Sequence, residues 1–533
     1  TILNQTTSFG FEMIYNFSKI IFILFVLSCF IIGIFDVVTR RYQYALLLVN
    51  GFNKKQCLKL ILKERIKVMK DYIAVIGGGL AGCEAAYQIA KRGIKVKLYE
   101  MKPKKFTEAH SNKNFAEIVC SNSFKSNLHT NACGLLKEEL RYLDSLLIKT
   151  ADETQVPAGQ ALAVDREKFS EKITKLINEN PLIEVVNEEI TDISKMSKDG
   201  IVIIATGPLT SKGMTEEIAK ITGQDKLYFY DAAAPIITKE SIDFNIAFWG
   251  DRYEQEKKKE ETIEQWKDRI NAQKASYVNL PMSQEEYERF CNELINAEVV
   301  MLHEFEKREI FEGCMPVEVM AKRGLDTLRF GPLKPVGFDD PRTGKRPYAV
   351  VQLRQDDVEG KIFNMVGFQT NLKFGEQKRV FSLIPGLENA EFVKYGVMHR
   401  NTYINSPEHL SSDYSMKNRP NVFFAGQMTG VEGYIESASS GFVAGINAAA
   451  RALGITVPSF DDRTGIGALA KYISEGGRGN FVPMNVNFGI IAPPDKKVKG
   501  GKKVRNEALS ARSLEIIDIA AEELLRLRQR ENI

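Results

Sequence analysis

This chain of 533 residues lacks several features that would assign it to a simple class. Its seven cysteines show no paired spacing, which argues against a disulfide framework or a zinc site and indicates reduced cytosolic thiols. Its net charge is only +4, so the overall balance permits contact with nucleic acid without predicting it. No internal repeat is evident. A hydrophobic content of 44% and a charged content of 26% are globular values, and the length predicts two or more domains.

The sequence also lacks a convincing membrane span. The apolar run at residues 20–35 falls slightly short of the roughly 20 residues that cross a bilayer, and no small-residue cleavage signal follows it. Met69 lies just before the first expected strand. We therefore expect residues 1–68 to be an N-terminal extension translated from upstream sequence. The alternative is a single-pass anchor at residues 20–38, with Arg40 and Arg41 marking its cytoplasmic side.

A complete dinucleotide-binding fingerprint follows this extension. The β-branched run 72–76 leads into Gly-Gly-Gly-Leu-Ala-Gly (77–82), and a helical pattern begins at residue 83. The glycines allow a tight turn, close approach of a pyrophosphate and close helix packing. A second strand ends at a carboxylate that can accept a hydrogen bond from a ribose hydroxyl. The predicted cofactor-binding residues are Gly77, Gly78, Gly79, Leu80, Ala81, Gly82 and Glu100. A glycine turn without a ligand is the alternative.

Two later segments favour FAD as the cofactor. Residues 201–208 form a buried type of strand that ends in Ala-Thr-Gly, and residues 421–427 form another that ends in Ala-Gly-Gln. A helix rich in small residues follows the second one. In flavoproteins with two dinucleotide folds, such a late turn approaches the flavin. These segments add Thr206, Gly207, Gly426, Gln427 and Gly430 to the predicted cofactor-binding residues. An ordinary strand–helix unit is the alternative for each segment.

Cys120 is the candidate for covalent chemistry. It lies in Ile-Val-Cys-Ser-Asn-Ser-Phe (118–124), and these polar neighbours argue against an apolar environment. A thiolate beside a redox cofactor indicates a redox-assisted thiol enzyme. A buried structural cysteine is the alternative.

With these motifs, the chain resembles the folate- and FAD-dependent RNA uracil-5-methyltransferases, bacterial flavoproteins that methylate the T-loop uridine of tRNA. The resemblance runs from about Met69 to Tyr472. Besides the segments at 77–86 and 118–124, it rests on Ala-Leu-Ala-Val-Asp-Arg (161–166), Phe-Glu-Gly-Cys-Met-Pro-Val-Glu (311–318), Pro-Tyr-Ala-Val-Val-Gln-Leu-Arg-Gln-Asp (347–356), Asn-Met-Val-Gly-Phe-Gln-Thr-Asn-Leu (364–372), Tyr-Gly-Val-Met-His-Arg-Asn-Thr-Tyr-Ile-Asn (395–405) and Gly-Gln-Met-Thr-Gly-Val-Glu-Gly-Tyr-Ile-Glu-Ser (426–437).

The resemblance implies a cytoplasmic enzyme that places a methyl group on C5 of a uridine. The cofactor is FAD, methylenetetrahydrofolate is the carbon donor, and NADH or NADPH reduces the flavin. The expected partner is tRNA, with ribosomal RNA as a second possible substrate; no stable protein partner and no membrane are implied. By resemblance, Cys120 is the thiol close to the flavin, and its role as nucleophile, relay or base stays open.

One position departs from the family pattern. Family members carry a second cysteine in Tyr-x-Asn-Cys-Pro-Met, whereas this chain has Leu280 in Tyr-Val-Asn-Leu-Pro-Met (277–282). Leucine has neither a nucleophile nor a titratable proton. Cys314, Cys133 or Cys291 could substitute, and we predict Cys314, which lies in the family's own Phe-Glu-Gly-Cys motif, as a catalytic residue with Cys120; packing is the alternative for each of the three. Two rival hypotheses follow: an RNA-binding flavoprotein that has lost methylation, and a membrane-tethered FAD oxidoreductase.

A further group is predicted at the folate site. His399 and Arg400, with Tyr395 nearby, are suited to stacking on a pterin or to contacting its carboxylate tail. Gln352 and Arg354, on a Val-Val-Gln-Leu-Arg strand, are candidates of the same kind. Local hydrogen bonding is the alternative for each of them.

The expected fold is α/β: an FAD-binding Rossmann-like domain of the two-dinucleotide-fold type with an inserted α/β domain. The predicted parts are the extension 1–68, the first FAD-binding part 69–230, an inserted substrate or RNA domain 231–331, the second FAD-binding part 332–470, and a basic loop with a C-terminal helix, 471–533. The basic run 496–505 is read either as a phosphate-contacting loop or as a solvated linker.

Overall fold

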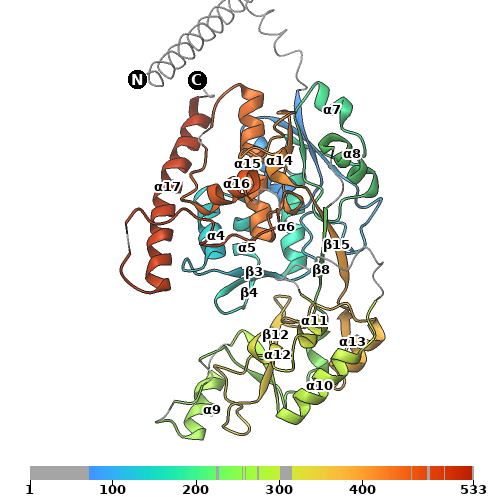
Figure 1. Cartoon of the computed structure of the whole chain (residues 1–533), viewed down its shortest axis with the longest axis vertical. Helices are drawn as coiled ribbons and strands as arrows, with labels where there is room; N and C mark the ends of the chain where they lie inside the picture. Colours follow the sequence, from blue (N-terminus) through green and yellow to red (C-terminus); the bar gives the residue numbers. More distant parts are fainter. Residues whose placement is uncertain are drawn as a thin grey trace, which may run out of the picture. The chain divides into compact units, whose positions relative to one another are not determined.

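The computed structural model describes residues 71–223, 227–254, 256–258, 260–272, 275–300, 315–457, 459–476, 481–496 and 498–530 (Figure 1). All of them belong to one compact unit, Lys70–Ile533. The expected extension 1–68, with its apolar run, lies outside the described residues. Within the described ranges, no helix is both long enough and apolar enough to cross a membrane.

A five-stranded parallel sheet forms the centre of the first lobe. Its strand order is β16-β7-β1-β2-β6, and every neighbouring pair is parallel. The central strands are short apolar runs that are buried along almost their whole length, as expected for a parallel sheet covered on both faces. The strands are β1 (Tyr72–Ile76), β2 (Lys95–Glu100), β6 (Ile183–Asn187), β7 (Val202–Ile204) and β16 (Val422–Phe424).

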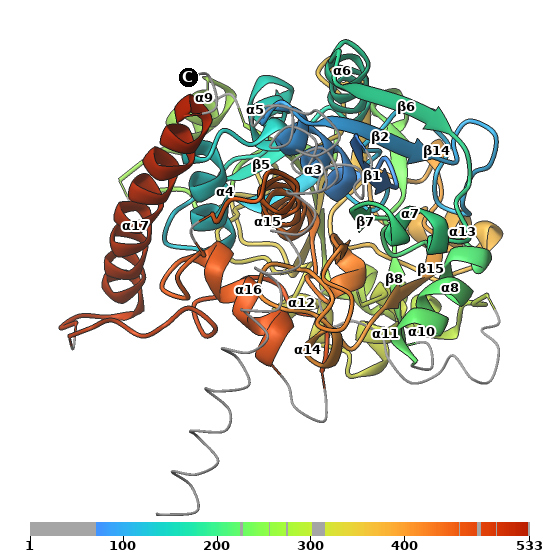
Figure 2. The same cartoon turned by 90° about the horizontal axis from the view of Figure 1, so that it is seen from above.

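Two helices meet backbone to backbone next to this sheet. α3 (Leu80–Ala90) follows β1, and α15 (Tyr434–Leu453) follows β16 and its turn; they lie side by side in Figure 2. A Cβ atom on Gly441 would lie 2.3 Å from the Ala81 carbonyl oxygen, and one on Gly445 would lie 2.9 Å from Ala85 Cα. Only glycine allows this approach. The contact brings the late Ala-Gly turn next to the first glycine loop.

The remaining elements of this lobe surround the sheet. A small antiparallel sheet, β3-β5-β4, begins directly after Cys120 and its polar neighbours. Its strands are β3 (Ser123–Ser126), β4 (Gln155–Val156) and β5 (Ala161–Val164). The helices are α4 (Ala132–Tyr142), α5 (Leu146–Glu153), α6 (Arg166–Asn178), α7 (Ser194–Lys198), α8 (Lys212–Thr222), α14 (Ser406–His409), η4 (Gln427–Thr429), α16 (Gly465–Glu475) and α17 (Lys502–Arg530).

The second lobe, which we call the insertion, comprises residues 233–397. The chain enters it from β8 (Leu227–Ala232) and leaves it into β15 (Met398–Tyr403), and these two strands pair antiparallel. The insertion contains a six-stranded antiparallel sheet of order β10-β11-β12-β13-β9-β14. Its strands are β9 (Ile236–Thr238), β10 (Phe248–Trp249), β11 (Tyr277–Met282), β12 (Ala349–Gln355), β13 (Ile362–Met365) and β14 (Phe392–Lys394), and its helices are η1 (Lys239–Ser241), α9 (Ile263–Ala272), α10 (Gln284–Asn296), α11 (Val317–Lys322), α12 (Thr327–Phe330) and α13 (Phe374–Phe381).

The insertion is longer than the sequence suggested. We expected it to end near residue 331, with residues 332–470 returning to the FAD-binding domain. Strand β12 instead pairs with β11 on one side and β13 on the other, and β14 closes the far edge of the same sheet. The reason is that a β-branched run shows that a strand forms but not which sheet the strand joins.

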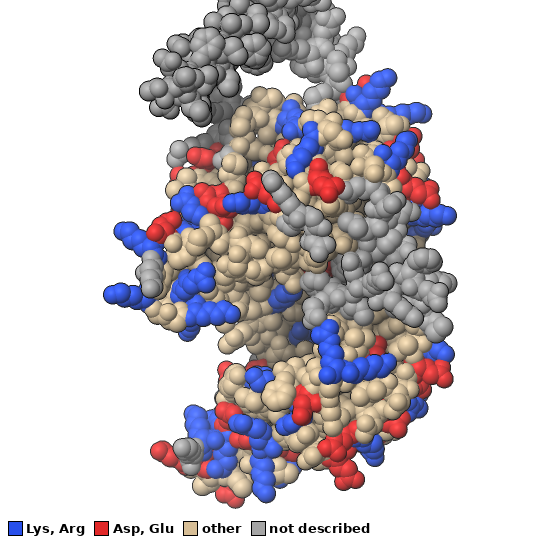
Figure 3. Space-filling model, viewed as in Figure 1, with Lys and Arg blue, Asp and Glu red and all other residues tan. Residues whose placement is uncertain are grey.

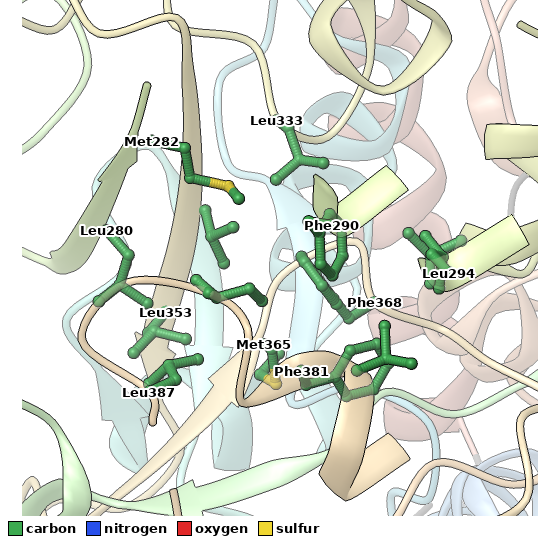
Figure 4. Packing of buried hydrophobic residues seen from close by; sticks show 14 of the residues in the cluster. Leu280, Met282, Phe290, Leu294, Leu333, Leu353, Met365, Phe368, Phe381 and Leu387 are labelled. Atoms are coloured by element: carbon green, nitrogen blue, oxygen red, sulfur yellow. The ribbon is translucent and has the colours of Figure 1, made fainter. Parts of the chain in front are cut away.

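Leu280 lies in the apolar core of the insertion. Its side chain is 0% exposed, and in Figure 4 it lies among apolar side chains that include Met282, Leu353 and Leu387. A Cβ atom on Gly386 would lie 2.8 Å from Leu280 Cδ2, so the side chain packs directly on that backbone. An apolar residue at position 280 is therefore explained by packing.

A buried carboxylate joins the C-terminal helices to this framework. Glu139 on α4 accepts hydrogen bonds from the backbone N–H groups of Gly465 (2.7 Å) and Ile466 (2.9 Å), where α16 begins, and from Ser513 Oγ (2.5 Å) on α17. A carboxylate at a helix N-terminus satisfies free N–H groups and complements the helix dipole. Helix α17 already begins at Lys502, so the last part of the expected basic loop is helical.

We predict that Glu139→Gln destabilises the protein by roughly 1–3 kcal/mol, because an amide has one acceptor oxygen where the carboxylate has two. Burial raises the pKa of Glu139 from 4.5 to about 7. Since the folded-state pKa is raised, this group's contribution to stability is complete below about pH 4.5 and is lost as the pH rises through 7. Urea unfolding across this range tests both points. Glu507→Gln, at an exposed position on α17, the helix that carries Ser513, is the control; identical unfolding curves for both variants would contradict the prediction.

Candidate functional site

A single pocket brings together most of the residues predicted from the sequence. It encloses about 980 Å³ including its open mouth, within the size range of cofactor sites. The predicted residues that line it are Gly77, Gly78, Gly79, Leu80, Ala81, Glu100, Cys120, Thr206, Gly207, Gly426 and Gln427. One pocket is therefore lined by the glycine loop, the Ala-Thr-Gly turn, the late Ala-Gly turn and the thiol.

The glycine loop is shaped to receive a dinucleotide. A Cβ atom on Gly79 would meet no atom within 4 Å, so the backbone at this position faces open space at the start of α3. The loop is fixed by Glu100, whose Oε2 accepts from the Gly78 N–H at 2.7 Å and whose Oε1 accepts from the Lys102 N–H at 2.9 Å. These residues fit a pyrophosphate on the helix N-terminus. A ribose contact by Glu100 stays a prediction.

Two of the described predicted residues, Gly82 and Gly430, do not line this pocket. Gly82 has a packing role, since its Cβ atom would lie 1.8 Å from the Gly77 carbonyl oxygen. Gly430 adopts φ of +82° and packs against Phe481. His399 and Arg400 lie on β15, and only their backbone is described. Cys314 lies outside the described residues.

Cys120 contacts the first residue of α15. Its Sγ lies 2.8 Å from the hydroxyl oxygen of Tyr434, and the same oxygen accepts from the backbone N–H groups of Cys120 (3.1 Å) and Ser121 (3.2 Å). Two accepted hydrogen bonds occupy both lone pairs of a phenol. The remaining tyrosine proton is therefore available to Sγ, which can accept it either as a thiol or as a thiolate. Burial, followed by the charge of Cys120, raises the pKa of Tyr434 well above its ordinary value, so the phenol keeps its proton.

A buried guanidinium adds positive charge at the same loop. Arg166, the first residue of α6, donates from Nη1 to the carbonyl oxygens of Ile118 and Val119, both at 3.1 Å, and its Nε lies 2.8 Å from Asp356 Oδ2. Burial alone would lower the pKa of Arg166, but the charges of Asp356, Tyr434 and Cys120 outweigh it and raise the pKa. A nearby cation stabilises a thiolate.

The insertion holds the other side of this loop. Arg354 at the end of β12 is buried and donates to Asn122 Oδ1 (2.9 Å) and Ser121 Oγ (2.7 Å). Asn122 Nδ2 in turn donates to the carbonyl oxygens of Val164 (3.1 Å) and Gln355 (3.0 Å). Arg354, predicted as a folate candidate, thus contacts the loop that carries Cys120.

Two other folate candidates have structural partners as well. The Tyr395 ring stacks between Phe374 (5.0 Å between centroids) and Phe392 (5.2 Å). The Gln352 side chain accepts from Arg252 and donates to Asn279. Neither residue lines the cofactor pocket. Their predicted contact with folate has no support from this geometry.

The other described cysteines lie apart from this chemistry. Burial raises the pKa of Cys83, whose Sγ donates to the Gly78 carbonyl, and raises that of Cys291 to about 11. Cys133 Sγ lies 3.5 Å from the Ser126 carbonyl oxygen, outside the pocket. Among the described cysteines, only Cys120 lines the pocket.

Sequence reasoning missed Tyr434 and Arg166 as site residues. Both lie within family motifs, at the end of Gly-Val-Glu-Gly-Tyr (430–434) and of Ala-Leu-Ala-Val-Asp-Arg (161–166). Each is the first residue of a helix, a position from which a side chain can reach a neighbouring loop. That combination is the signal that could have identified them.

Comparisons with known proteins agree with this architecture. Residues 72–456 match the family model described as Glucose inhibited division protein A. The methylenetetrahydrofolate–tRNA-(uracil-5-)-methyltransferase TrmFO of Acetivibrio thermocellus is 59% identical over 449 residues, which is 84% of this chain and 98% of the relative. That of Natranaerobius thermophilus is 56% identical over 446 residues, with the same coverage. A solved structure of Aquifex aeolicus GidA shares the fold, with a TM-score of 0.59 at 17% identity, over 86% of this chain and 76% of that chain.

We predict that Gly79→Ala folds normally but retains roughly tenfold less FAD, because the added methyl group occupies open space that a bound pyrophosphate needs. The measurement is the flavin absorbance per protein after gel filtration, with thermal unfolding as the test of folding. Gly375→Ala on α13 is a matched control, since a Cβ atom there also meets nothing within 4 Å. Equal FAD content in the two variants would overturn this assignment.

We predict that Arg166→Gln slows alkylation of Cys120 by iodoacetamide roughly tenfold at neutral pH, because the loop loses a cation and two hydrogen bonds. Peptide mass spectrometry separates Cys120 from the other thiols. Arg463→Gln, which removes a guanidinium paired with the half-buried Asp461, is the control. An unchanged rate in the Arg166 variant would show that this cation does not act on the thiol.

Proposed function

This chain belongs to the family of methylenetetrahydrofolate–tRNA-(uracil-5-)-methyltransferases, and we propose that it forms 5-methyluridine in tRNA, with the T-loop uridine as its target. The cofactor is FAD, methylenetetrahydrofolate is the carbon donor, and NADH or NADPH is the source of electrons. A cytoplasmic location and the absence of a stable protein partner stay predictions.

The observation that carries this proposal is the shared pocket of the glycine loop and Cys120. A reactive thiol and a dinucleotide-binding loop line the same space, and the Tyr434 hydroxyl and the Arg166 guanidinium both act on the thiol or its loop. A flavoprotein that only transfers hydride needs no such thiol. Uracil C5 becomes nucleophilic when a thiolate adds at C6 or when the ring is otherwise activated, so a thiol in the cofactor pocket suits this substrate.

The proposed methylation needs a carbon donor, a hydride donor and a route for the proton of uracil C5. A carbon–carbon bond forms between the one-carbon unit and uracil C5, the two bonds from that carbon to folate nitrogens break so that tetrahydrofolate leaves, and C5 loses its proton. Bound reduced FAD supplies the hydride that brings the carbon from the methylene to the methyl level. Gly77–Ala81, Gly426 and Gln427 would hold this cofactor.

The residues around Cys120 have separate roles in positioning the thiol and its loop. Tyr434 directs its proton to Sγ, which holds the sulfur in place and gives it a partner for proton exchange. Arg166 and Arg354 fix the backbone and the polar side chains of the loop. Because C5 lies inside stacked bases in a folded RNA loop, the target uridine must be unstacked to reach this pocket.

Leu280 does not count against methylation in this arrangement. Its side chain is fully buried in the core of the insertion and does not line the cofactor pocket. The rival hypothesis of a lapsed methyltransferase depended on the loss of a cysteine at this position, and the packing gives leucine a structural reason. The rival of a membrane-tethered oxidoreductase depended on residues 20–35, which lie outside the described residues.

We predict that the FAD-loaded protein, given methylenetetrahydrofolate and NADPH, converts uridine to 5-methyluridine in an unmodified tRNA transcript, scored by nucleoside mass spectrometry. Cys120→Ala should reduce the rate by at least roughly a hundredfold, because its thiol has no replacement among the described residues of the pocket. Product in ribosomal RNA but not in tRNA would show that ribosomal RNA is the substrate. Absence of product in both would refute the proposal.

Leu280→Cys separates the proposal from the lapsed-catalyst rival. We expect this variant to lose roughly 1–3 kcal/mol of stability from the smaller side chain and to keep a rate within a few-fold of the parent protein. A parent protein without activity that gains methylation through Leu280→Cys would instead support the rival.

A further inference from the structure

A second groove opens on the insertion, apart from the cofactor pocket. It encloses about 1,380 Å³ including open solvent. The face in Figure 3 shows Lys and Arg side chains mixed with Asp and Glu, so bulk charge does not single out an RNA-binding surface there. The groove is distinguished by the residues that line it: Pro157, Phe244, Asn245, Ile246, Ala247, Phe248, Trp249, Lys267, Ile270, Ala275, Pro341, Arg342 and Gln355.

A stacked aromatic pair forms part of the groove wall. The rings of Phe244 and Trp249 lie 6.3 Å apart between centroids with an angle of 16° between their planes. Trp249 is fixed from behind by the buried Phe363, at 5.8 Å and 65°. Phe244 is 40% exposed. The pair therefore forms a supported aromatic platform next to solvent, which suits a nucleobase because every base has a flat aromatic face.

The charged groups of the groove favour an anionic ligand. Lys267 on α9 is exposed, and Arg342 comes from the loop after α12. Asp340 fixes the Arg342 side chain through two contacts, Nε to Oδ1 at 3.1 Å and Nη2 to Oδ2 at 2.8 Å, so its donors are held in place. Among the described residues that line the groove, none carries a carboxylate, although the neighbouring Asp340 offsets the charge of Arg342 and leaves Lys267 as the main positive charge of the lining. An aromatic surface combined with cations suits nucleotides, in which bases alternate with phosphates.

The groove also adjoins the loop that carries Cys120. Gln355 lines the groove, and its carbonyl oxygen accepts from Asn122 Nδ2 at 3.0 Å. Pro157 lines it from the first lobe, and the neighbouring Ala158 carbonyl accepts from the Tyr277 hydroxyl of the insertion at 3.1 Å. A ligand in the groove therefore lies against Gln355, which contacts the loop that carries Cys120.

We propose that this groove binds an unpaired segment of the RNA substrate, with one base stacked on Phe244 and the flanking phosphates near Lys267 and Arg342. The proposal rests on the proposed function, since it assigns the groove to nucleotides that adjoin the methylated uridine. Bases splayed out of a folded loop are the usual targets of aromatic platforms in RNA-binding proteins.

Tryptophan fluorescence tests occupancy directly. The chain has two tryptophans, and Trp266 is fully buried, so Trp266→Phe leaves Trp249 as the only reporter. We expect a short oligouridylate to quench this emission in the FAD-loaded full-length protein, with a midpoint that rises roughly tenfold in a Phe244→Ala background. An acidic peptide of similar charge serves as the second probe. Quenching by the peptide alone, or by neither probe, overturns the proposal.

Methylation kinetics provide the second test. Phe244→Ala should raise KM for a tRNA transcript roughly tenfold and leave kcat within about twofold, because the residue binds RNA away from the reacting atoms. Lys267→Gln should weaken binding and reduce the slope of log affinity against log salt by about one. Phe330→Ala is the control, since this phenylalanine is on the same lobe, is 80% exposed and does not line the groove.

The outcomes separate the two proposals. If the parent protein methylates tRNA and Phe244→Ala behaves like Phe330→Ala, the groove assignment fails and the proposed function stands. If the parent protein neither binds nor methylates RNA, the proposed function fails. Loss of FAD or of thermal stability in Phe244→Ala would indicate a folding defect. In that case the salt dependence of RNA binding by Lys267→Gln, a change at an exposed position, decides whether the groove binds RNA.

Discussion

The close contact between α3 and α15 is the constraint on which the whole site depends. Gly441 and Gly445 let the two helix backbones touch at Ala81 and Ala85, and a side chain at either glycine would force the helices apart. Because helices are rigid, this contact also fixes their first turns. It thereby sets the glycine loop next to the late Ala-Gly turn, and it places Tyr434, the first residue of α15, within hydrogen-bonding distance of Cys120. One helix contact thus positions the cofactor site and the thiol together.

The insertion completes the site from the opposite side. Three consecutive residues at and after the end of β12 contact the loop or its supporting arginine: Arg354 donates to Ser121 and Asn122, the Gln355 carbonyl accepts from Asn122, and Asp356 pairs with Arg166. A shift of this strand end would therefore move the thiol. Gln355 also lines the second groove. An RNA bound there would therefore contact a residue that is hydrogen-bonded to the loop that carries Cys120. The insertion therefore holds the candidate site in place, and it is also the lobe proposed to bind RNA.

The parts of the site that were predictable from sequence are those with local causes. The glycine loop needs a strand, a turn and a helix within a short segment, and Cys120 has polar neighbours in the chain itself. The contact between Cys120 and Tyr434 joins residues 314 positions apart, so no local pattern could show it. The same applies to Arg166 with Asp356, and to the strands after residue 331, which have ordinary β-strand patterns but join the sheet of the insertion. Long-range pairing was the missing information in each case.

The environment of Leu280 bears on how many thiols the chemistry needs. In the apolar core that contains Leu280, burial raises the pKa of Cys291 to about 11, so a thiol there stays protonated at neutral pH. Leu280 belongs to the same buried cluster, away from the residues that line the cofactor pocket. Cys120 differs, because a phenol directs its proton to the sulfur and a guanidinium holds its loop. The contacts that support the reactivity of Cys120 are therefore present in this chain. Leucine in place of cysteine at position 280 takes no thiol away from the cofactor pocket.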